Sequence, residues 1–384
     1  MAEVKFLIVA GEPSGDRHGA DLVAALKDLN PEATFYGIGG EEMAREGVNL
    51  LYHLEQLAFL GFAEIIKHLP FIFKVLGNLK RWIDRNQPAA VILIDYPGFN
   101  LRLARIASRM DVPVVYYICP QLWAWGRRRV EKIRRFVDLP LVIFKFEEDF
   151  YRHYHIPSKF VGHPLVDEIK IILSATDFRK KHNLHPENPI VALLPGSRVN
   201  EVNKLLPLMV ETAMEFKKKY PVEFVIGKSA SVPLATYQEI IKDRNGIQIV
   251  EKDTHHLMKH AFAAVVASGT ATLETGYLGT PMIVLYMVSP LTYRIGKLLV
   301  KIKNIALANI VSGEQVVPEL IQKNVTVENI YRELEKYFQD PAYYKKVTNA
   351  LKIIPEKLGN PGAAIRAARE IVDSLELSFS RPEV

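Results

Sequence analysis

An aspartate at the end of an apolar run is the side chain in this sequence best suited to move a proton. Asp95 follows residues 89–94, which are typical of a buried strand. A carboxylate at the carboxyl end of a parallel strand points into the ligand crevice of an α/β fold. Desolvation there raises its pKa toward that of a useful general base. The alternative is a structural role as the cap of the helix expected after Gly98.

A polar, glycine-containing turn follows the first apolar run. Residues 11–19 read GEPSGDRHG and contain the candidate cleft residues Glu12, Ser14, Gly15, Asp16 and His18. Glycines allow a close backbone approach, and the free N–H groups at a helix start suit an anion. The spacing is not GxGxxG, so a dinucleotide site is not expected. Two acids and a histidine in one turn favour a functional site over an ordinary helix cap by Ser14 or Asp16.

Two tryptophans stand next to three arginines after another apolar run. Trp123 and Trp125 precede arginines at 127, 128 and 129. These residue types can stack on a ligand and pair with its charge. The same mixture occurs in nucleic-acid-binding proteins, but the apolar strands around it are those of an enzyme scaffold. We therefore expect the tryptophans to face the cleft, no nucleic-acid partner, and either a functional or a merely solvated role for the basic residues 128–135.

A second set of candidates begins at residues 194–198, LPGSR. Gly196 and Ser197 can present backbone N–H groups, and Arg198 can form a forked pair with a phosphate. Glu201 lies one helical turn further on and is placed to hold Arg198. The alternative is a simple turn.

The most specific local signal is residues 267–274, ASGTATLE. A strand ends in Ser268, Gly269 and Thr270, and a helix begins. Its N-terminus offers free amides and the positive end of the helix dipole to a diphosphate. Glu274, one turn into the helix, can accept hydrogen bonds from ribose hydroxyls. The alternative is a capped helix with an incidental glutamate.

The sequence contains no recognisable metal motif. His255, His256 and His260 have helical spacing, but there is no HExxH and no cysteine partner. Cys119 is the only cysteine and follows an apolar run, so it is expected to pack as a small hydrophobe. We expect no metal and no cofactor, so that the charge on a bound diphosphate is met by Arg198 and helix dipoles.

The elements that must position these residues alternate between buried strands and helices. Such continuous apolar strands indicate parallel sheets covered on both faces. In the first half the expected strands are residues 4–10, 34–38, 89–94, 114–118, 139–144 and 160–161. In the second half they are residues 190–194, 222–226, 247–250, 263–267 and 282–286. The predicted fold is α/β, with two Rossmann-like doubly wound domains facing a cleft.

The polar stretch 167–189 separates the two halves. We predict an N-terminal domain over residues 1–170, a nucleotide-binding domain over 185–360 and a terminal helical segment over 361–384. The last segment either packs back on the N-terminal domain or exchanges between subunits. The sequence leaves monomer and homodimer both open.

The chain carries a formal net charge of +6, which favours anionic partners. It shows no signal peptide and no stretch of about 18 apolar residues, so a cytoplasmic location is expected. Residues 60–82 and 293–310 mix apolar and basic side chains, as membrane-surface segments do, or as buried helices with snorkelling lysines do. In the first stretch the predicted membrane contacts are Phe62, Ile66, Leu69, Phe71 and Phe73.

Taken together, the motifs resemble the lipid-A-disaccharide synthase family of GT-B glycosyltransferases. They occur in the family's order over nearly the whole chain, and the first and fourth are far more specific than the generic SGT…E. The matching segments are residues 11–19, 37–40 (GIGG), 94–100 (IDYPGFN), 120–126 (PQLWAWG), 160–164 (FVGHP), 194–198, 268–274 and 309–322. Within the last segment Glu314 and Gln315 depart from the family pattern, which leaves their roles open.

The resemblance implies an inverting, metal-independent transferase of lipopolysaccharide synthesis, peripheral on the inner face of the inner membrane. Its donor would be UDP-2,3-diacylglucosamine, its acceptor 2,3-diacylglucosamine 1-phosphate (lipid X), and its product the β-1,6-linked disaccharide 1-phosphate. Asp95 would be the base, with His18 in reserve. Arg198 and the helix start at Thr270 would stabilise departing UDP. The further UDP-site residues would be Glu274, Asn309, Glu319 and Gln322.

Two other functions remain open at this point. Another GT-B enzyme, such as the peptidoglycan N-acetylglucosaminyltransferase or a UDP-GlcNAc 2-epimerase, would keep the UDP site, but residues 11–16 and the Trp123–Trp125 segment argue against it. A non-catalytic protein that binds anionic lipid would have no use for Glu274 beside a Ser-Gly-Thr helix start.

Overall fold

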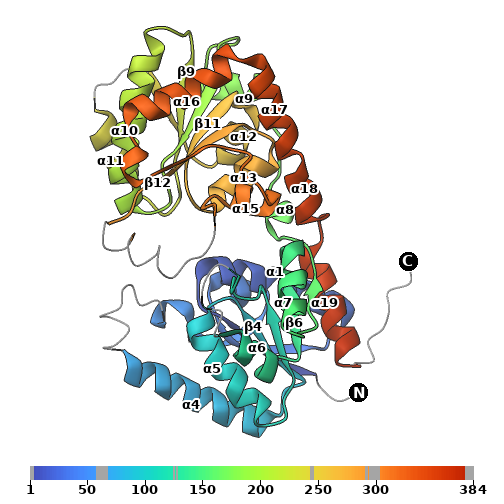
Figure 1. Ribbon diagram of the computed structural model, residues 1–384. Helices are drawn as coiled ribbons and strands as arrows, with labels where there is room; N and C mark the ends of the chain where they lie inside the picture. The colour runs from blue at the N-terminus through green and yellow to red at the C-terminus, as the bar shows by residue number, and fades with distance from the viewer. Residues whose placement is uncertain are drawn as a thin grey trace. The chain divides into compact units, whose positions relative to one another are not determined.

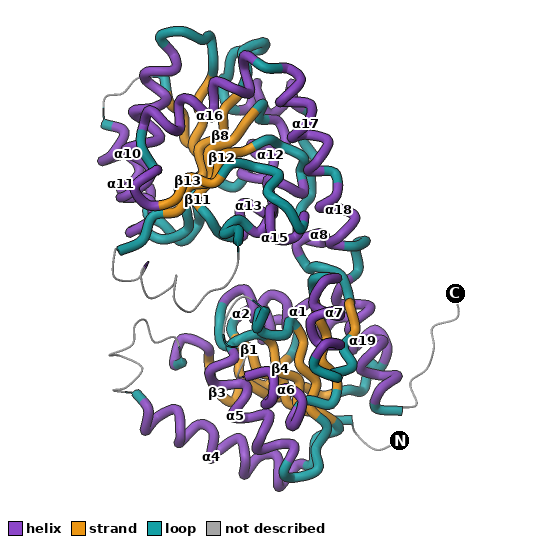
Figure 2. Tube along the Cα trace, in the orientation of Figure 1, coloured by secondary structure: helices purple, strands orange, loops and turns teal. Residues whose placement is uncertain are grey.

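The computed structural model describes residues 4–57, 68–123, 126, 129–242, 246–289, 293 and 303–376. The chain forms two compact units, here called the N-terminal unit (Met1–Asp167 with Leu358–Val384) and the C-terminal unit (Glu168–Lys357). In each, the strands gather into one sheet with helices around it (Figures 1 and 2). The chain thus leaves the N-terminal unit near the break expected from the polar stretch and returns to it for its last segment.

The N-terminal unit is built on a parallel sheet in the order β3-β2-β1-β4-β5-β6-β7. The order reverses between β1 and β4, which pair in parallel with Ala10 opposite Ile94. The strands are β1 (Lys5–Ala10), β2 (Thr34–Gly39), β3 (Val48–His53), β4 (Ala90–Ile94), β5 (Val114–Tyr117), β6 (Leu139–Val142) and β7 (Lys159–Phe160).

The C-terminal unit repeats this plan with the order β10-β9-β8-β11-β12-β13, again all parallel. Its switch point lies between β8 and β11. The strands are β8 (Ile190–Leu194), β9 (Glu223–Gly227), β10 (Ile247–Val250), β11 (Ala263–Ala267), β12 (Met282–Tyr286) and β13 (Glu319–Ile321).

Helices cover the sheets of both units. In the N-terminal unit and at its boundaries they are α1 (Pro13–Leu29), α2 (Glu41–Arg45), η1 (Leu54–Gln56), α4 (Leu69–Asn86), α5 (Pro97–Ser108), α6 (Val130–Phe136), α7 (Lys145–His153), α8 (Leu165–Glu168), α18 (Ile353–Leu358) and α19 (Ala363–Ser374). In the C-terminal unit they are α9 (Ala175–Lys181), α10 (Val199–Lys217), α11 (Leu234–Ile241), α12 (Thr254–His260), α13 (Thr270–Tyr277), α15 (Leu307–Ser312), η3 (Gln322–Asn324), α16 (Val327–Gln339) and α17 (Pro341–Leu351).

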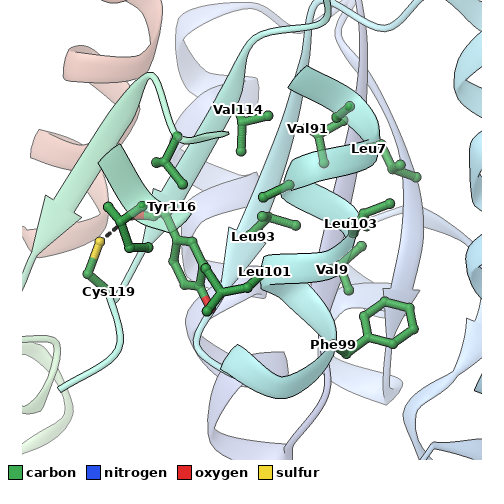
Figure 3. Close-up of a cluster of buried hydrophobic side chains, with 14 of the residues drawn as sticks. Leu7, Val9, Val91, Leu93, Phe99, Leu101, Leu103, Val114, Tyr116 and Cys119 are labelled. Carbon is green, nitrogen blue, oxygen red and sulfur yellow. Dashed lines mark hydrogen bonds between the residues drawn. The ribbon is translucent and has the colours of Figure 1, made fainter. Parts of the chain in front are cut away.

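Alternate residues of the N-terminal strands enter opposite cores, as the pleat of a sheet requires. Leu7 and Val9 of β1 join Val91 and Leu93 of β4 in a fully buried cluster beneath α4, α5 and α6 (Figure 3). Cys119 belongs to this cluster, and its thiol donates to the carbonyl of Tyr116. It packs as a buried hydrophobe, as expected.

The opposite face of the sheet is covered by α1 and by the C-terminal helix α19, which contact each other. The Asp167 carboxylate accepts hydrogen bonds from the N–H groups of Gly362 (2.6 Å) and Ala363 (3.1 Å) and so anchors the start of α19. Arg366 adds a hydrogen bond from its Nε to the carbonyl of Val161 (2.8 Å). The terminal helix α19 thus covers this face together with α1.

Strands with continuous apolar sequence lie within a residue or two of their expected positions, whereas two edge strands were not predicted. Only Val48 of β3 is fully buried, and its other positions include Asn49 and His53. β13 has three residues. The apolar and basic pattern over residues 62–85 predicts a long helix with a possible break at Pro70; α4 begins at Leu69, so Pro70 lies in its first turn, where the missing N–H of proline costs nothing. The part of the expected helix before residue 68 lies outside the described residues.

Gly37 in β2 lies where the main chains of β1 and β2 approach each other closely. A Cβ at Gly37 would lie 1.7 Å from the carbonyl oxygen of Ile8 on β1. A main-chain atom of a central strand cannot move aside, so we expect Gly37→Ala to lower the free energy of unfolding by about 3 kcal/mol.

Gly77 provides the control for that measurement by urea denaturation. A Cβ there meets nothing within 4 Å, and the residue is inside α4. We expect Gly77→Ala to raise the free energy of unfolding by about 0.5–1 kcal/mol. Equal stability of the two variants would contradict the close approach described for Gly37.

Candidate active site

Most of the predicted functional segments lie at the carboxyl ends of parallel strands, and four of them follow the strands that flank a switch point, where open α/β sheets bind ligands. In the N-terminal unit, residues 11–19 follow β1, Asp95 follows β4 and Trp123 comes after β5. In the C-terminal unit, Arg198 follows β8 and residues 268–274 follow β11. The two units are described separately below.

Asp95 occupies an unusual main-chain turn. Asp95 and Tyr96 have φ values of 43° and 47°, a left-handed conformation that costs free energy for residues other than glycine. The turn is held because the carbonyl of Asp95 accepts hydrogen bonds from the Tyr116 hydroxyl (2.6 Å) and the Asn100 side-chain amide (2.8 Å). Asn100 is fully buried and also donates to the carbonyl of Ile94 (3.1 Å).

The surroundings of Asp95 raise the pKa of its carboxyl group toward neutral pH. Burial raises the pKa of Asp95 to about 6, and the nearby Glu12 carboxylate contributes in the same direction. The Tyr96 ring covers Gly11, where a Cβ would come within 2.3 Å of it. A glycine at position 11 is therefore required for the turns after β1 and β4 to lie side by side. The carboxyl group is suited to accept a proton near pH 6 or above.

The start of α1 differs from the sequence expectation in its capping. Glu12 is the N-cap residue and forms no side-chain cap, with Pro13 in the first turn. Glu12 and Ser14 are exposed, whereas Gly15 and Asp16 are buried. The exposed pair remains available to a ligand at the end of β1.

Asp16 has a structural role that sequence spacing did not indicate. Its carboxylate accepts hydrogen bonds from the N–H groups of Gly40 (2.6 Å), Glu42 (3.0 Å) and Met43 (3.2 Å). It therefore caps the start of α2 rather than its own helix. Its side chain is only 4% exposed, so it fixes the turn between β2 and α2 against α1.

His18 lies beside His163, a residue of the turn after β7. Burial lowers the pKa of His18 to about 4, and the positive charge of Arg17 lowers it further. Burial likewise lowers the pKa of His163 to about 3, with a smaller contribution from His18. The Nδ1 of His163 accepts a hydrogen bond from the N–H of Leu165 (3.1 Å). Both imidazoles are therefore neutral at physiological pH.

Trp123 is positioned by a buried carboxyl group that the sequence analysis did not identify. Glu147 of α7 is fully buried; it accepts hydrogen bonds from the indole N–H of Trp123 (2.9 Å) and the N–H of Phe144 (3.1 Å). Burial raises the pKa of Glu147 to about 7. The Trp123 ring also packs edge-on against Phe146. Trp125 and the arginines at 127 and 128 lie outside the described residues.

In the C-terminal unit, the turn after β8 presents Arg198 on an exposed edge. The Glu201 carboxylate lies 3.4 Å from the Arg198 guanidinium, the pair that the sequence predicted, and also accepts a hydrogen bond from the Ser197 N–H at 3.2 Å, which was not predicted. Gly196 has φ 116°, and a Cβ there would meet the Glu201 carboxylate at 2.4 Å. The Arg198 side chain is 81% exposed, so its guanidinium is accessible to a phosphate.

The helix α13 begins without a side-chain cap. Its N-cap is Gly269, and Thr270 next to it is exposed. Without a side chain on Gly269, the helix start is open to an anion. Thr272 Oγ1 accepts a hydrogen bond from the N–H of Leu307 (3.2 Å), and the Ser268 hydroxyl donates to the carbonyl of Ile305 (3.3 Å). These contacts join α13 to the start of α15.

Glu274 lies on the partly exposed side of α13. Its carboxylate is 3.6 Å from Nε2 of His255 on α12. The sequence analysis considered His255 only as part of a metal motif and did not predict its contact with Glu274. His256 and His260 bond main-chain atoms of Ile172 (3.1 Å) and Leu173 (2.9 Å).

Asn309, Glu319 and Gln322 are brought together as a framework rather than as open ligand groups. Glu319 accepts from the N–H groups of Ile305 and Ala306, both at 3.0 Å, and from the Asn309 amide at 2.8 Å. Asn309 is fully buried and accepts from two further N–H groups of the chain before β13. Gln322 binds both main-chain polar groups of Val288 (2.7 and 3.2 Å). The three side chains fix the segments beside Ser268 and α13.

The predicted membrane-contact residues differ in how far their side chains are exposed. Phe73 is 59% exposed, whereas Leu69 and Phe71 are partly buried, Phe71 against the Tyr52 ring. Phe62 and Ile66 lie outside the described residues. None of the helices described is long and apolar enough to cross a membrane. Within the same residues, histidine, cysteine and carboxylate side chains form no group of three suited to a metal ion.

Several supporting residues could not be found from sequence alone. Asn100 and Tyr116 donate hydrogen bonds to the Asp95 carbonyl. Glu147 accepts a hydrogen bond from Trp123, and His163 lies beside His18. Asn100 and His163 stand inside the segments 94–100 and 160–164 already singled out, which was the available signal. Glu147 sits in an ordinary charged helix sequence, KFEED, and nothing in that sequence indicates its burial.

Comparison with solved structures identifies the class of fold. Calicheamicin glycosyltransferase CalG4 has a TM-score of 0.63 at 14% identity, covering 98% of this chain and 99% of that chain. UDP-GlcNAc 2-epimerase from Neisseria meningitidis, bound to UDP-GlcNAc, has a TM-score of 0.61 at 14% identity, covering 98% and 100%. With its two parallel doubly wound sheets, the molecule has the predicted GT-B fold.

Sequence comparison identifies the family within that class. The family model described as lipid-A-disaccharide synthetase matches residues 6–360. Lipid-A-disaccharide synthases of Geobacter sulfurreducens and Myxococcus xanthus are 39% and 40% identical over 373 and 378 residues, covering 97% of this chain and of each relative. The chain belongs to the lipid-A-disaccharide synthase family and is a glycosyltransferase of lipid A biosynthesis.

The role of Asp16 can be tested by stability. In Asp16→Asn an amide N–H₂ replaces one carboxylate oxygen and faces a buried N–H donor, so the free energy of unfolding should fall by about 2 kcal/mol. Asp28→Asn is the matched control, because Asp28 is an exposed residue of the same helix; its free energy of unfolding should change by less than about 0.5 kcal/mol. Equal values for the two variants in urea denaturation would contradict a capping role for Asp16.

Proposed function

We propose that this protein joins UDP-2,3-diacylglucosamine to 2,3-diacylglucosamine 1-phosphate, giving the β-1,6-linked disaccharide 1-phosphate and UDP with inversion at the donor's anomeric carbon. The family membership over residues 6–360 supports the choice of reaction. The observation that carries the mechanism is Asp95, a desolvated carboxyl group held in a strained turn at a switch point.

Asp95 acts as the general base. It accepts the proton of the acceptor 6-hydroxyl while that oxygen forms a bond to the anomeric carbon and the bond to the UDP oxygen breaks. His18 is the weaker candidate, because its pKa of about 4 makes it a poorer proton acceptor than a carboxylate whose pKa is about 6. Glu12, Ser14 and Gly15 at the start of α1 and Trp123 shape the acceptor side.

The C-terminal unit stabilises the departing UDP. Arg198 is exposed after β8, and the uncapped start of α13 offers N–H groups and a favourable dipole to the diphosphate. Gly196, Ser197, Ser268, Gly269 and Thr270 supply the close main-chain approach. Glu274 holds the ribose hydroxyls. Asn309, Glu319 and Gln322 contribute by fixing this surface, since their polar atoms are engaged with the chain itself.

The substrates of this proposal carry acyl chains, and the exposed Phe73 with the basic side chains of α4 supports contact with an anionic membrane surface. We place the enzyme in the cytoplasm, peripheral on the inner face of the inner membrane. Its partners are the two acylated glucosamines and that surface.

The reaction is tested by UDP release. In detergent micelles containing EDTA, UDP-2,3-diacylglucosamine should release UDP only when lipid X is added, because the acceptor oxygen is the nucleophile and no metal takes part. The assay couples released UDP to a chromogenic reaction. Acceptor-independent epimerisation of UDP-GlcNAc, or lipid binding with no release, would instead identify an epimerase or a non-catalytic lipid-binding protein.

The role of Asp95 is tested by substitution and pH. Below a pH of about 6 the carboxyl group is protonated and cannot accept a proton, so wild-type kcat should rise with pH through about 6 and then level off. Asp95→Asn should lower kcat by about 10²–10⁴-fold and remove this acid limb.

Asp111→Asn is the control for Asp95→Asn, because Asp111 is exposed and also has a left-handed main chain, with φ 56°. It should keep the full kcat and the acid limb. If folded Asp95→Asn protein turns over like Asp111→Asn, Asp95 is not the base.

A further inference from the structure

A groove between helices of the N-terminal unit is not used by the proposed reaction. It has a volume of about 650 Å³ and runs along α4, α5 and α6, which lie side by side in the molecule (Figure 1). Its apolar lining comprises Phe73, Leu76, Leu101, Ile106 and Phe136. Its basic lining comprises Lys80, Arg102, Arg105, Arg109 and Lys132. None of the described residues that line it is acidic.

The basic side chains of the groove are largely uncompensated. Arg102 donates to the carbonyl of Gly98, whereas Lys80, Arg105, Arg109 and Lys132 have no side-chain hydrogen bond or ion pair with any described residue. This differs from neighbouring helix surfaces, where arginines at 134 and 135 pair with Glu131, and Arg152 pairs with Asp149. Like charges gathered without partners repel one another, and an anion bound among them would relieve that repulsion.

Gly77 borders open space in the groove. Gly77 lies inside α4, where glycine costs about 0.5–1 kcal/mol relative to alanine. A Cβ at this position would meet nothing within 4 Å, so no packing contact requires glycine here. The space above Gly77 is groove, since Gly77 is one of its lining residues. A side chain much longer than that of alanine at this position would extend into the groove.

We infer that this groove binds one anionic membrane phospholipid, with the phosphate among Lys80, Arg105, Arg109 and Lys132 and the beginning of an acyl chain along the apolar floor. Charge complementarity selects an anion, and the apolar lining, which includes the exposed Phe73, selects an amphiphile over a free phosphate ion. The inference rests on the membrane contact proposed above for Phe73 and α4 and assigns it a discrete lipid site; Asp95 is not among the lining residues, and occupation of the groove does not depend on the transferase reaction.

The role of the basic side chains is tested by measuring how the full-length protein sediments with lipid vesicles. One set of vesicles contains phosphatidylcholine alone, and the other contains phosphatidylcholine with phosphatidylglycerol. Wild-type protein should bind the anionic vesicles more tightly. Arg105→Gln/Arg109→Gln should weaken that binding by about 30-fold, or roughly fivefold for each charge removed. The control Lys345→Gln/Lys352→Gln removes the same charge from exposed positions of the C-terminal unit and should bind within about twofold of wild type.

Shape is tested at Gly77 without changing any charge. Gly77→Met should fill the groove and weaken binding to anionic vesicles by about tenfold, equivalent to roughly two displaced methylene groups. Gly77→Ala, which adds only a Cβ into open space, should bind like wild type. Because both substitutions favour the helix, a loss of binding in Gly77→Met cannot be attributed to unfolding, which thermal denaturation will verify.

Three outcomes would overturn the inference. Equal weakening by the groove and control charge pairs would indicate general electrostatic attraction. Equal binding by Gly77→Met and Gly77→Ala would show that nothing occupies the groove. Displacement of the vesicles by millimolar inorganic phosphate as effectively as by a short-chain phosphatidylglycerol would show that the groove recognises a free anion instead of a lipid.

Discussion

The main-chain carbonyl of Asp95 accepts two hydrogen bonds in a buried environment, and the arrangement of the N-terminal site depends on them. Tyr116 and Asn100 supply these bonds from β5 and α5. They offset the cost of two successive left-handed residues, which in turn place the carboxyl side chain beside Glu12. Desolvation and a neighbouring negative charge then raise its pKa. The strained turn at Asp95, the buried hydrogen bonds that offset its strain and the raised pKa of the Asp95 carboxyl group therefore all follow from the way this turn is packed.

The same principle of buried polar groups organising exposed ones recurs elsewhere in the molecule. Glu147 positions Trp123 from a fully buried site, and its raised pKa reflects the cost of placing a carboxyl group there. In the C-terminal unit, the Asn309–Glu319 pair fixes the main chain beside α13. Burying such groups is unfavourable unless their hydrogen bonds are satisfied, and in each of these places the bonds join separate segments next to a strand end.

The sequence was sufficient for the elements that are fully buried or marked by glycine. The central strands and the turns at Asp95, Arg198 and Ser268 follow from apolar runs and turn residues, whereas the order of the strands and the two switch points are known only from the structure. It was not sufficient for the two edge strands β3 and β13, because β3 is mostly exposed or half-buried and β13 has only three residues. Nor could it assign Asp16 to the start of α2 or Glu147 to Trp123, because those partners lie 24 or more residues away and hydrogen bonds between distant segments leave no periodic trace.

The discontinuous N-terminal unit has a consequence for biosynthesis. Its sheet is complete by Phe160, but the helix that covers one of its faces, α19, comes after the entire C-terminal unit. During translation the apolar face of α1 therefore stays uncovered while about 190 residues are made, the span of Glu168–Lys357. Exposed apolar surface makes such nascent intermediates prone to aggregation. The Asp167 carboxylate is synthesised before the C-terminal unit, but the N–H groups that donate to it, those of Gly362 and Ala363, become available only after that unit has been made.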